Sequence, residues 1–393
     1  MKTTIIKQPF PLWALISLST AYFIVGTSSL SVIALTWQIS GGLDVPPTDI
    51  AYLMTVFALT FAFSAPLMQV FFSRFSRFTI LSGGLVILAG GLVLSALSPN
   101  FWTLFAARAL MGFGAAAISP MCSAIGAGLS APEQQGRAIG IVFAGLTFAT
   151  VLGTPMSAWL GTVMEWRQVM ALLAGLTLAC LVGVRLLVKD RQKGAPLRLY
   201  SILEALLRFR SGSAVLVTFL QMTASFCIYA LIAPLMSEKF GMAEAMIGVV
   251  LLFYGVHGVL GNVIAGWLSD RMGTTKIITI SLIGVGVGYL IIWAIGPVIW
   301  LAFLGIAIWA ACGMMFHSPQ QQRIANIDPE KRSLLLALHA SALYLGISAG
   351  SSVSRFVAVT FGIDWTPLAS FAFLALCLVL FLATLLHERK EPS

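Results

Sequence analysis

The stretch that decides the fold is a basic segment in the middle of the chain, residues 189–210, which reads KDRQKGAPLRLYSILEALLRFR. It contains no apolar run long enough to cross a membrane. On each side lies a block of roughly 180–190 residues made of apolar segments, each near the ~20 residues that a helix needs to span a ~30 Å hydrocarbon core. The segment therefore predicts a linker, 189–212, between two membrane-embedded halves, 1–188 and 213–393.

The composition of the chain agrees with a membrane protein. Hydrophobic residues make up 59% and charged residues 9% of the sequence, whereas soluble domains carry about 25% charged residues. The net charge of +9 does not indicate a nucleic-acid partner, because the basic residues lie in loops between apolar segments. The five cysteines fall inside apolar segments, which predicts packing roles and no disulfides.

The apolar segments divide into six spans before the linker and six after it. Turn-forming residues separate them, for example Gly41-Gly42, Pro99-Asn100 and Gly296-Pro297. The first segment has no cleavage site at signal-peptide length, so we expect it to remain as a span. The predicted spans are 11–39, 48–72, 78–98, 100–129, 137–162, 167–188, 213–237, 244–268, 276–295, 297–323, 333–360 and 365–387.

Lysine and arginine predict the orientation of these spans. They concentrate in the loops on the side of the two termini and the linker, whereas the opposite loops hold Arg167 and Lys239 beside six acidic residues. Basic loops stay in the cytoplasm, and twelve spans put both termini on one side. We therefore expect a multi-pass protein of the bacterial-type inner membrane with both termini in the cytoplasm.

The loop after the second span of each half carries the first family resemblance. In the second half, Gly266, Asp270, Arg271 and Gly273 stand in a pattern that resembles the cytoplasmic loop motif of the major facilitator superfamily. The resemblance implies a gating role. The first half has Arg74 and Arg77 at the matching place without the acid or the glycines, so its gating role is less expected. The alternative is an ordinary basic loop.

Further motifs narrow this resemblance. The fourth span, from Arg108, resembles the Arg-and-Gly motif of the superfamily's fourth helix, and the fifth resembles the motif of drug:proton antiporters in the sugar-efflux (arabinose efflux permease) group. In the eleventh span, His339 and Tyr344 stand where that group usually has asparagine. Together the motifs imply an all-α membrane protein of twelve helices in two pseudo-symmetric six-helix bundles. The antiporter-type residues are Gly145, Gly153, Pro155 and Gly161.

The fifth span also has a physical reading of its own. Its three glycines are spaced by eight residues, so they drift slowly around one helix face and let a neighbouring helix pack closely. Pro155 removes one backbone hydrogen bond and bends the helix. We expect this bent helix at the interface between the halves, although each glycine taken alone is equally compatible with plain packing.

Polar residues inside spans are costly in lipid and are therefore candidates for function. With no acid nearby in sequence, Arg108 must find a carbonyl, a hydroxyl or a water-filled cavity, whereas Arg355 is expected to extend outward from its span. The resemblance implies a central cavity lined by the first, fourth, seventh and tenth spans. Helical spacing would give the same residues for a packed core. The candidate cavity residues are Tyr22, Thr27, Gln221, Tyr229, Trp309, Phe316, His317, Gln320, His339 and Tyr344.

Proton coupling would have to use groups other than carboxylates, because the acidic residues lie in loops or at span ends. Histidine titrates near neutrality, so His257 and His317 are candidates for proton coupling. Arg108 is a third candidate. The alternative is transport without proton coupling.

The predicted function is secondary transport. The chain has no nucleotide-binding loop, no G-x-S-x-G and no H-x-x-x-H pair, so we expect no enzyme activity, cofactor or metal. The resemblance implies a monomeric carrier that exports a small polar or amphipathic solute, such as a sugar, nucleoside, drug or other metabolite, in exchange for protons. The alternatives are an uncoupled facilitator or importer of a small metabolite and, in a different class, a membrane sensor or channel.

Overall fold

The computed structural model describes residues 10–72, 74–131, 134–190, 192, 199–328 and 331–390. In this part of the chain, twelve helices are long and apolar enough to cross a membrane, which confirms the predicted number of spans. Short turns join them. The seventh span begins at Phe209, four residues before the expected position.

The first half holds the spans before the linker. Its helices are α1 (Leu12–Ala34), α2 (Thr36–Leu43), α3 (Ile50–Phe71), α4 (Arg77–Ala96), α5 (Phe101–Gly128), α6 (Gln135–Phe148), α7 (Thr154–Val163) and α8 (Trp166–Leu187).

The linker helix and the second half follow. The helices are α9 (Leu199–Leu207), α10 (Phe209–Tyr229), α11 (Ile232–Phe240), α12 (Ile247–Met272), α13 (Thr274–Ala294), α14 (Ile299–Ala325), α15 (Arg332–Phe361) and α16 (Thr366–Lys390).

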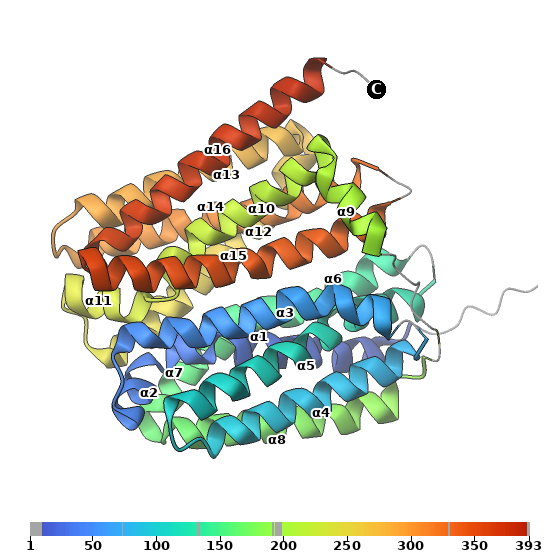
Figure 1. The fold of residues 1–393 in the computed structure, drawn as a ribbon, viewed down its shortest axis with the longest axis horizontal. Helices are drawn as coiled ribbons and strands as arrows, with labels where there is room; N and C mark the ends of the chain where they lie inside the picture. The colour runs from blue at the N-terminus through green and yellow to red at the C-terminus, as the bar shows by residue number, and fades with distance from the viewer. Residues whose placement is uncertain are drawn as a thin grey trace, which may run out of the picture.

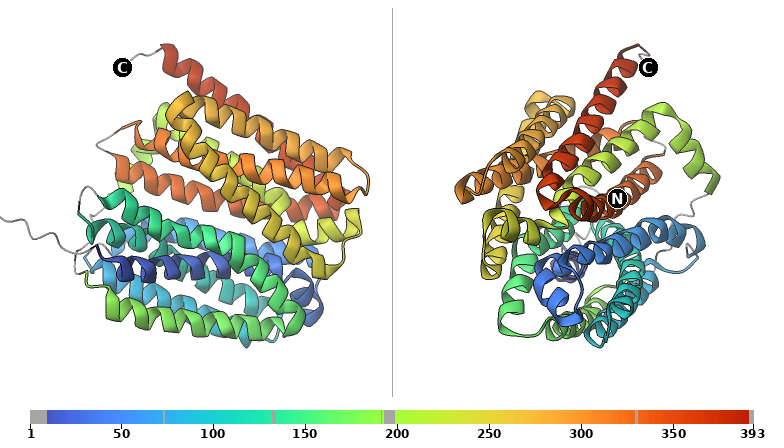
Figure 2. Two further views of the ribbon diagram at one scale, coloured as in Figure 1. Left: turned by 180° about the vertical axis from the view of Figure 1, so that it is seen from behind. Right: turned by 60° about the vertical axis from the view of Figure 1, so that its left-hand side comes forward.

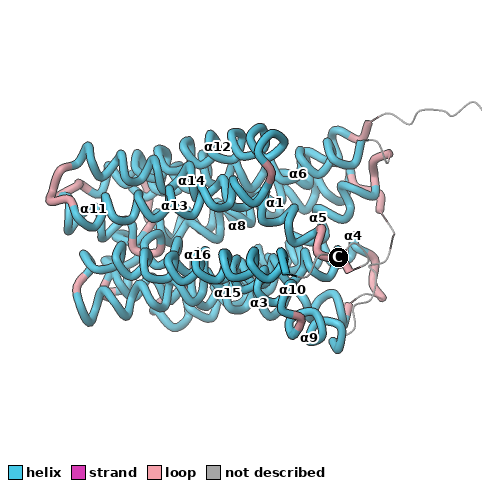
Figure 3. The backbone as a smooth tube through the Cα atoms, turned by 90° about the horizontal axis from the view of Figure 1, so that it is seen from above, coloured by secondary structure: helices cyan, strands magenta, loops and turns pink. Residues whose placement is uncertain are grey.

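The two halves lie side by side as two helix bundles with their long axes roughly parallel (Figures 1 and 2). The start of α1, the end of α16 and α9 lie at the same end of the molecule, which we call the terminal face; the end that carries α2 and α11 is the opposite face. Seen from above, the bundles form an elongated body with α15 and α3 adjacent (Figure 3). Contacts between α3 and α15 are among the most extensive that join the halves.

The first span of each half is interrupted at an equivalent place. In the first half, α1 ends at Ala34 and α2 resumes after Leu35; in the second, α10 ends at Tyr229 and α11 resumes after Leu231. Each second span is then preceded by a short 3₁₀ turn, Pro47–Asp49 or Glu244–Met246. These paired irregularities are an internal repeat at the level of structure.

The fifth span is also irregular, and Pro155 explains where. Between α6 and α7 lies a π-helical turn, Ala149–Gly153, and Pro155 follows directly at the start of α7. Proline cannot donate a backbone hydrogen bond, so the regular i→i−4 pattern is broken at this point. The Thr154 hydroxyl donates to the Ala149 carbonyl at 3.1 Å, which satisfies an acceptor inside the wider turn.

Side chains are distributed as expected for a protein in lipid. Large apolar residues such as Trp13, Leu97 and Trp300 are exposed on the outside of the bundles, while one cluster of buried apolar residues extends through both halves. A smaller cluster that includes Ala205 and Leu335 packs α9 against the second half. The exposed apolar surface is the surface that a bilayer covers.

Candidate functional site

A polar cluster lies inside the second half, where three spans meet. His339 of α15 places Nδ1 3.1 Å from the Thr218 hydroxyl of α10. Gln320 of α14 donates its amide to the Ala214 carbonyl at 2.9 Å and approaches Thr218 at 3.4 Å. Gln320 and His339 are buried, and His317 lies one turn from Gln320 on the same helix. The structure therefore brings three of the predicted cavity residues into one region.

An aromatic cluster lies in the same half. The ring of Tyr254 of α12 is 4.8 Å from that of Tyr229 and 4.9 Å from that of Trp309, and Tyr289 packs on Trp309 at 5.6 Å. Tyr229, Tyr254 and Trp309 come from α10, α12 and α14, and Tyr289 comes from α13. Four helices therefore contribute to one aromatic cluster. The sequence predicted that Tyr229 and Trp309 line the central cavity.

Gln221 connects the aromatic cluster to the hydrogen-bonding groups of α10. Its amide donates to the Ser225 hydroxyl at 3.2 Å, and Ser225 lies 3.2 Å from the Tyr289 hydroxyl. Among the described residues, the side-chain carbonyl oxygens of Gln221 and Gln320 are buried without a hydrogen-bond partner. An unpaired buried acceptor is unfavourable, so a donor from a bound molecule would stabilise either oxygen.

Three of the other predicted cavity residues lie elsewhere. Tyr344 stacks on Phe61 of the first half, with ring centroids 3.5 Å apart, so it belongs to the interface between the halves. Tyr22 packs against Phe143 at 5.2 Å, and Thr27 lies against the fifth span. Phe316 is fully buried beside His317. These residues therefore do not form one continuous wall.

Two of the hollows in the described structure are lined by residues other than the predicted cavity residues. One of about 340 Å³ lies at the terminal face between α9, α10 and the end of α16. The other, of about 250 Å³, lies between α3, α4 and α5 and is almost wholly apolar. The central cavity expected from the family resemblance thus stays a prediction.

Arg108 is fully buried in the first half and is satisfied by carbonyl groups. Its Nη1 donates to the Ser28 carbonyl at 2.7 Å, Nη2 to Ser29 at 2.8 Å, and Nε to Leu53 at 3.2 Å. The guanidinium also lies over the Phe57 ring at 4.6 Å. The sequence left a carbonyl, a hydroxyl or a water-filled cavity as partners of Arg108, and the structure shows carbonyls. Through them Arg108 connects α5 to α1 and α3.

His257 is separate from the polar cluster. It lies on α12, where its Nδ1 is 2.8 Å from the Phe253 carbonyl of its own helix and its ring packs on Phe253 at 4.0 Å. Its contacts are therefore local, in contrast to those of His339.

The glycines of the fifth span pack against α1. A Cβ at Gly145 would overlap the Ser19 carbonyl, a Cβ at Gly153 would overlap the Thr27 hydroxyl, and a Cβ at Gly161 would lie 2.5 Å from Leu35. The expected close helix packing is thus present, and the partner of the stripe is a helix of the same half. The interface between the halves lies on another part of this span, where Gly255 of α12 faces Val151.

The loop with the gating pattern has a different set of contacts. Gly273 adopts φ +83°, a conformation that favours glycine, and Arg271 stacks on Trp267 of its own helix at 3.7 Å. The space around Gly266 is open, so no helix packs closely there. The Asp270 side chain lies outside the described residues.

The corresponding arginines of the first half are attached differently. Arg77 donates to the Ala124 carbonyl at 3.4 Å and to the Gln192 side chain at 3.1 Å, which ties this loop to α5 and the linker. Arg74 is exposed and lies 5.7 Å from the Phe75 ring.

A set of polar contacts joins the halves near the opposite face. Arg355 of α15 pairs with Asp49 of the first half at 2.7 Å, and the Thr55 and Ser352 hydroxyls are 3.2 Å apart. Arg355 was expected to extend from its span toward the outer surface, and in the structure its guanidinium pairs there with a carboxylate of the other half. Toward the middle of the molecule, the ring of Tyr344 continues this interface.

The fold, the paired halves and the chain itself can be compared with known proteins. The sequence profile of the Major Facilitator Superfamily matches residues 16–207 and 214–393. The chain belongs to the major facilitator superfamily. Two relatives are similar to this chain over nearly their whole length. Inner membrane transport protein YdhP of Escherichia coli (strain K12) is 28% identical over 388 residues, covering 97% of this chain and 97% of that protein. A probable sugar efflux transporter of Helicobacter pylori (strain ATCC 700392 / 26695) is 21% identical over 361 residues, covering 91% of each.

Solved structures of the superfamily fold are similar over nearly the whole chain. A bacterial homologue of the human lysosomal transporter Spinster, in an inward-facing and occupied conformation, aligns with a TM-score of 0.76 at 15% identity, covering 98% of this chain and 100% of that one. The nucleoside transporter NupG aligns with a TM-score of 0.76 at 13% identity, covering 96% and 100%. At these identities the likeness shows the fold.

Membership of the major facilitator superfamily settles the class of function. The chain is a multi-pass transporter of small solutes and not an enzyme, and the sensor and channel alternatives are set aside. Sequence reasoning missed Thr218, Tyr254 and Asp49 as neighbours of predicted residues. A threonine or tyrosine in a span carries no distinctive signal, and Asp49 lies at the start of the predicted span 48–72, where the sequence does not show which residue it meets.

Proposed function

We propose that this superfamily member exports a small polar or amphipathic solute from the cytoplasm across the inner membrane in exchange for protons. Export is supported by the antiporter-type pattern from Gly145 to Gly161 and by the relative named as a probable sugar efflux transporter. The inner membrane is supported by the relative named as an inner membrane transport protein.

The observation that carries the proposal is the pair of unsatisfied oxygens on Gln221 and Gln320 in the second half. Polar groups inside a membrane span are retained where they serve a function. A solute with hydroxyl or amine donors would supply the missing hydrogen bonds, and His339 with Thr218 would add exchangeable donors and acceptors. We infer that this region recognises the polar part of the solute.

The aromatic cluster would receive the less polar part. The ring centroids of Tyr229, Tyr254 and Trp309 lie 4.8–6.1 Å from one another, and aromatic clusters of this kind suit sugars, nucleosides and drug-like molecules. Arg108 donates to three carbonyls of its own half, so it is not free to neutralise an anionic solute. A neutral solute fits this arrangement best.

Proton coupling is assigned to His317. It lies beside the polar cluster, whereas His257 interacts with its own helical turn. Imidazole is the side chain that changes charge near neutral pH, and the solute and the proton would compete for the same region. Arg108 would act by holding α1, α3 and α5 together.

The alternating movement follows from where the halves touch. The contacts Asp49–Arg355, Thr55–Ser352 and Phe61–Tyr344 run from the opposite face to the middle. We infer that this conformation gives access from the terminal face, and that Arg271, stacked on Trp267, engages another partner when that face closes. The gating role of Gly266, Asp270 and Gly273 belongs to this closing step.

The terminal face is assigned to the cytoplasm, because the basic loops gather there. A cysteine placed at Arg332, which is exposed at the start of α15, should react with a membrane-impermeant reagent only in opened cells. Reaction in intact cells would contradict this orientation.

The function can be tested in proteoliposomes that contain the purified protein. Candidate solutes are screened by counterflow without a pH gradient, and uptake of the same solute is then driven by a gradient. We expect His317→Gln to abolish gradient-driven accumulation and to leave counterflow intact, because glutamine keeps hydrogen bonding and removes titration.

The same measurement on His257→Gln and on the double variant separates the candidates. If accumulation persists in the double variant, histidine coupling is wrong and an uncoupled facilitator becomes the better interpretation. If no sugar, nucleoside or drug gives saturable counterflow, the proposed solute class is wrong.

A further inference from the structure

A basic pocket at the terminal face of the second half has no part in the proposed transport route. It encloses about 340 Å³, and its charged and aromatic lining consists of Arg208, Phe209, Arg210, Lys331, His387 and one carboxylate, Asp328. The α10 span begins at Phe209 and the last span ends at His387, and the two rings pack at 4.6 Å. The pocket therefore lies where two spans leave the hydrocarbon, at the depth of lipid headgroups.

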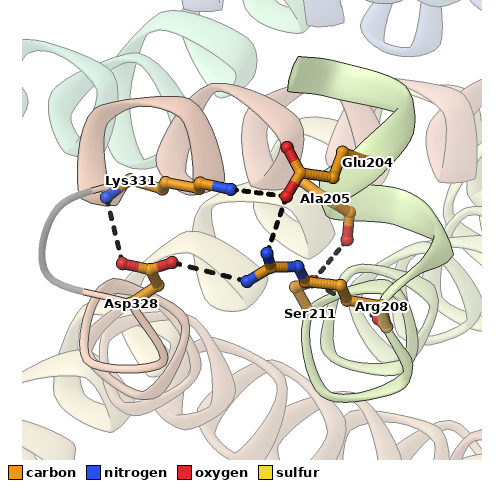
Figure 4. A network of polar contacts seen from close by, with 6 residues as sticks. All are labelled: Glu204, Ala205, Arg208, Ser211, Asp328 and Lys331. Carbon is orange, nitrogen blue, oxygen red and sulfur yellow. Dashed lines mark hydrogen bonds and ion pairs between the residues drawn. The ribbon is translucent and has the colours of Figure 1, made fainter. Parts of the chain in front are cut away.

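The acidic residues near the pocket are already engaged by other cations. Glu204 accepts from Lys331 at 2.9 Å and from Arg208 at 2.6 Å, and Arg208 also lies 3.9 Å from Asp328 (Figure 4). The hydrogen bond from Lys331 lowers the pKa of Glu204, so this carboxylate is ionised at neutral pH. The network fixes α9 to the turn between α14 and α15.

Arg210 is different from the residues of this network. It lines the pocket, its Nε is buried without a hydrogen-bond partner among the described residues, and none of the ion pairs found there involves it. Its position is the first turn of α10, where no side chain caps the helix and no acidic residue stands. A helix start carries partial positive charge, so the arginine and the helix together attract an anion.

The surface next to the pocket is apolar. Tyr200, Leu203 and Leu207 of α9 are 77%, 55% and 77% exposed, and their spacing of three and four residues puts them on one helix face. Phe209, at the pocket itself, is 49% exposed. Such a stripe beside basic residues is the pattern of a helix that lies in the membrane interface.

We propose that this pocket binds the phosphate of an anionic phospholipid, with Arg210 and the start of α10 holding the phosphate and the acyl chains lying along Leu203, Leu207 and Phe209. The positive site requires an anion, and the adjoining apolar stripe favours one that carries hydrocarbon chains. Binding fastens the linker helix to the second half at the membrane surface.

Native mass spectrometry of the full-length protein in detergent tests this assignment. Dioleoylphosphatidylglycerol or dioleoylphosphatidylcholine is titrated in, and the fraction of protein that retains lipid is measured. We expect preferential retention of phosphatidylglycerol, weakened about five-fold by Arg210→Gln, since a basic residue near a membrane surface contributes about 1 kcal/mol. Arg210→Lys should retain most of the affinity.

Arg185→Gln is the matched control, because Arg185 is an exposed arginine in the last turn of α8, at the same end of the other half. It should bind lipid like the unmodified protein. Equal retention by Arg210→Gln and Arg185→Gln would overturn the site, and so would a loss as large in Arg210→Lys as in Arg210→Gln. Displacement of the lipid by inorganic phosphate alone would overturn the assignment to a phospholipid.

Discussion

Arg108 is a charged residue in the interior of a membrane span, and its environment is made of backbone carbonyls. Three of its nitrogen atoms donate to carbonyls at 2.7–3.2 Å. A guanidinium presents donors in a fixed planar fork, whereas an ammonium is a single point on a flexible stem. The geometry thus requires arginine in particular and not merely a positive charge.

Arg108→Lys should destabilise the protein even though it keeps the charge. Lysine would satisfy one of the three carbonyls, and hydrogen bonds from charged donors contribute about 1.5–3 kcal/mol each, so the two lost bonds should cost about 3–6 kcal/mol. The measurement is the midpoint of thermal unfolding in detergent. Arg185→Lys, at an exposed position, is the control; equal midpoints for the two variants would show that the three bonds do not stabilise the fold.

The fifth span shows how one element combines tight packing with a local change of helix type. The glycine stripe lets α6 and α7 approach α1, and the π-helical turn Ala149–Gly153 precedes Pro155. At the turn, the backbone of Val151 also faces Gly255 of α12. One irregular segment therefore contacts the first span on one side and the other half on another.

Gly145→Ala and Gly140→Ala compare two glycines of the same helix. A Cβ at Gly145 would overlap the backbone carbonyl of Ser19, which cannot rotate away, whereas nothing lies within 4 Å of a Cβ at Gly140. Overpacking costs about 1–3 kcal/mol, so Gly145→Ala should lower the unfolding midpoint and slow transport. Gly140→Ala should be neutral or slightly stabilising, because alanine is the better helix former. Identical behaviour of the two variants would contradict the packing argument.

At the scale of the whole molecule, the two halves meet along α3 and α15 and where α12 packs on the fifth span. Polar contacts and a stacked pair of rings lie between α3 and α15. The Arg355 and Asp49 side chains are 27% and 23% exposed, so their ion pair is partly screened by solvent. Partly exposed pairs contribute modest free energy, which suits a contact that has to break during each cycle.

Removing this ion pair should shift the conformational equilibrium. With spin labels at Gly41 and Asp364, which are exposed at the opposite face, electron-electron distance measurements report its opening. A contribution of about 1 kcal/mol predicts that Asp49→Asn raises the population of the open state about five-fold. The exchanged pair Asp49→Arg with Arg355→Asp should restore the original distribution. Glu204→Gln removes the ion pairs of the linker helix with Arg208 and Lys331 and should leave the distances unchanged. A shift in that variant, or none in Asp49→Asn, would contradict the proposed role of the Asp49–Arg355 pair.

The spans, their number and the close packing of the fifth helix could be predicted because they depend on neighbouring residues. About twenty apolar residues suffice to define a span, and three glycines eight residues apart define a face of one helix. The same local pattern placed the break at Pro155. In the candidate site, the sequence identified Gln221, Trp309, Gln320 and His339 as polar or aromatic residues inside spans.

The partners of those residues were decided only by the tertiary structure. Arg108 reaches carbonyls 55 and 80 positions away, and Arg355 pairs with a carboxylate 306 positions away. Whether an intramembrane side chain faces its own bundle, the other half or lipid depends on how each helix is rotated about its axis and tilted. Hydropathy does not determine that rotation, because lipid and protein interior are almost equally apolar. The sequence by itself therefore determined which segments cross the membrane, and helix packing decided which polar groups meet.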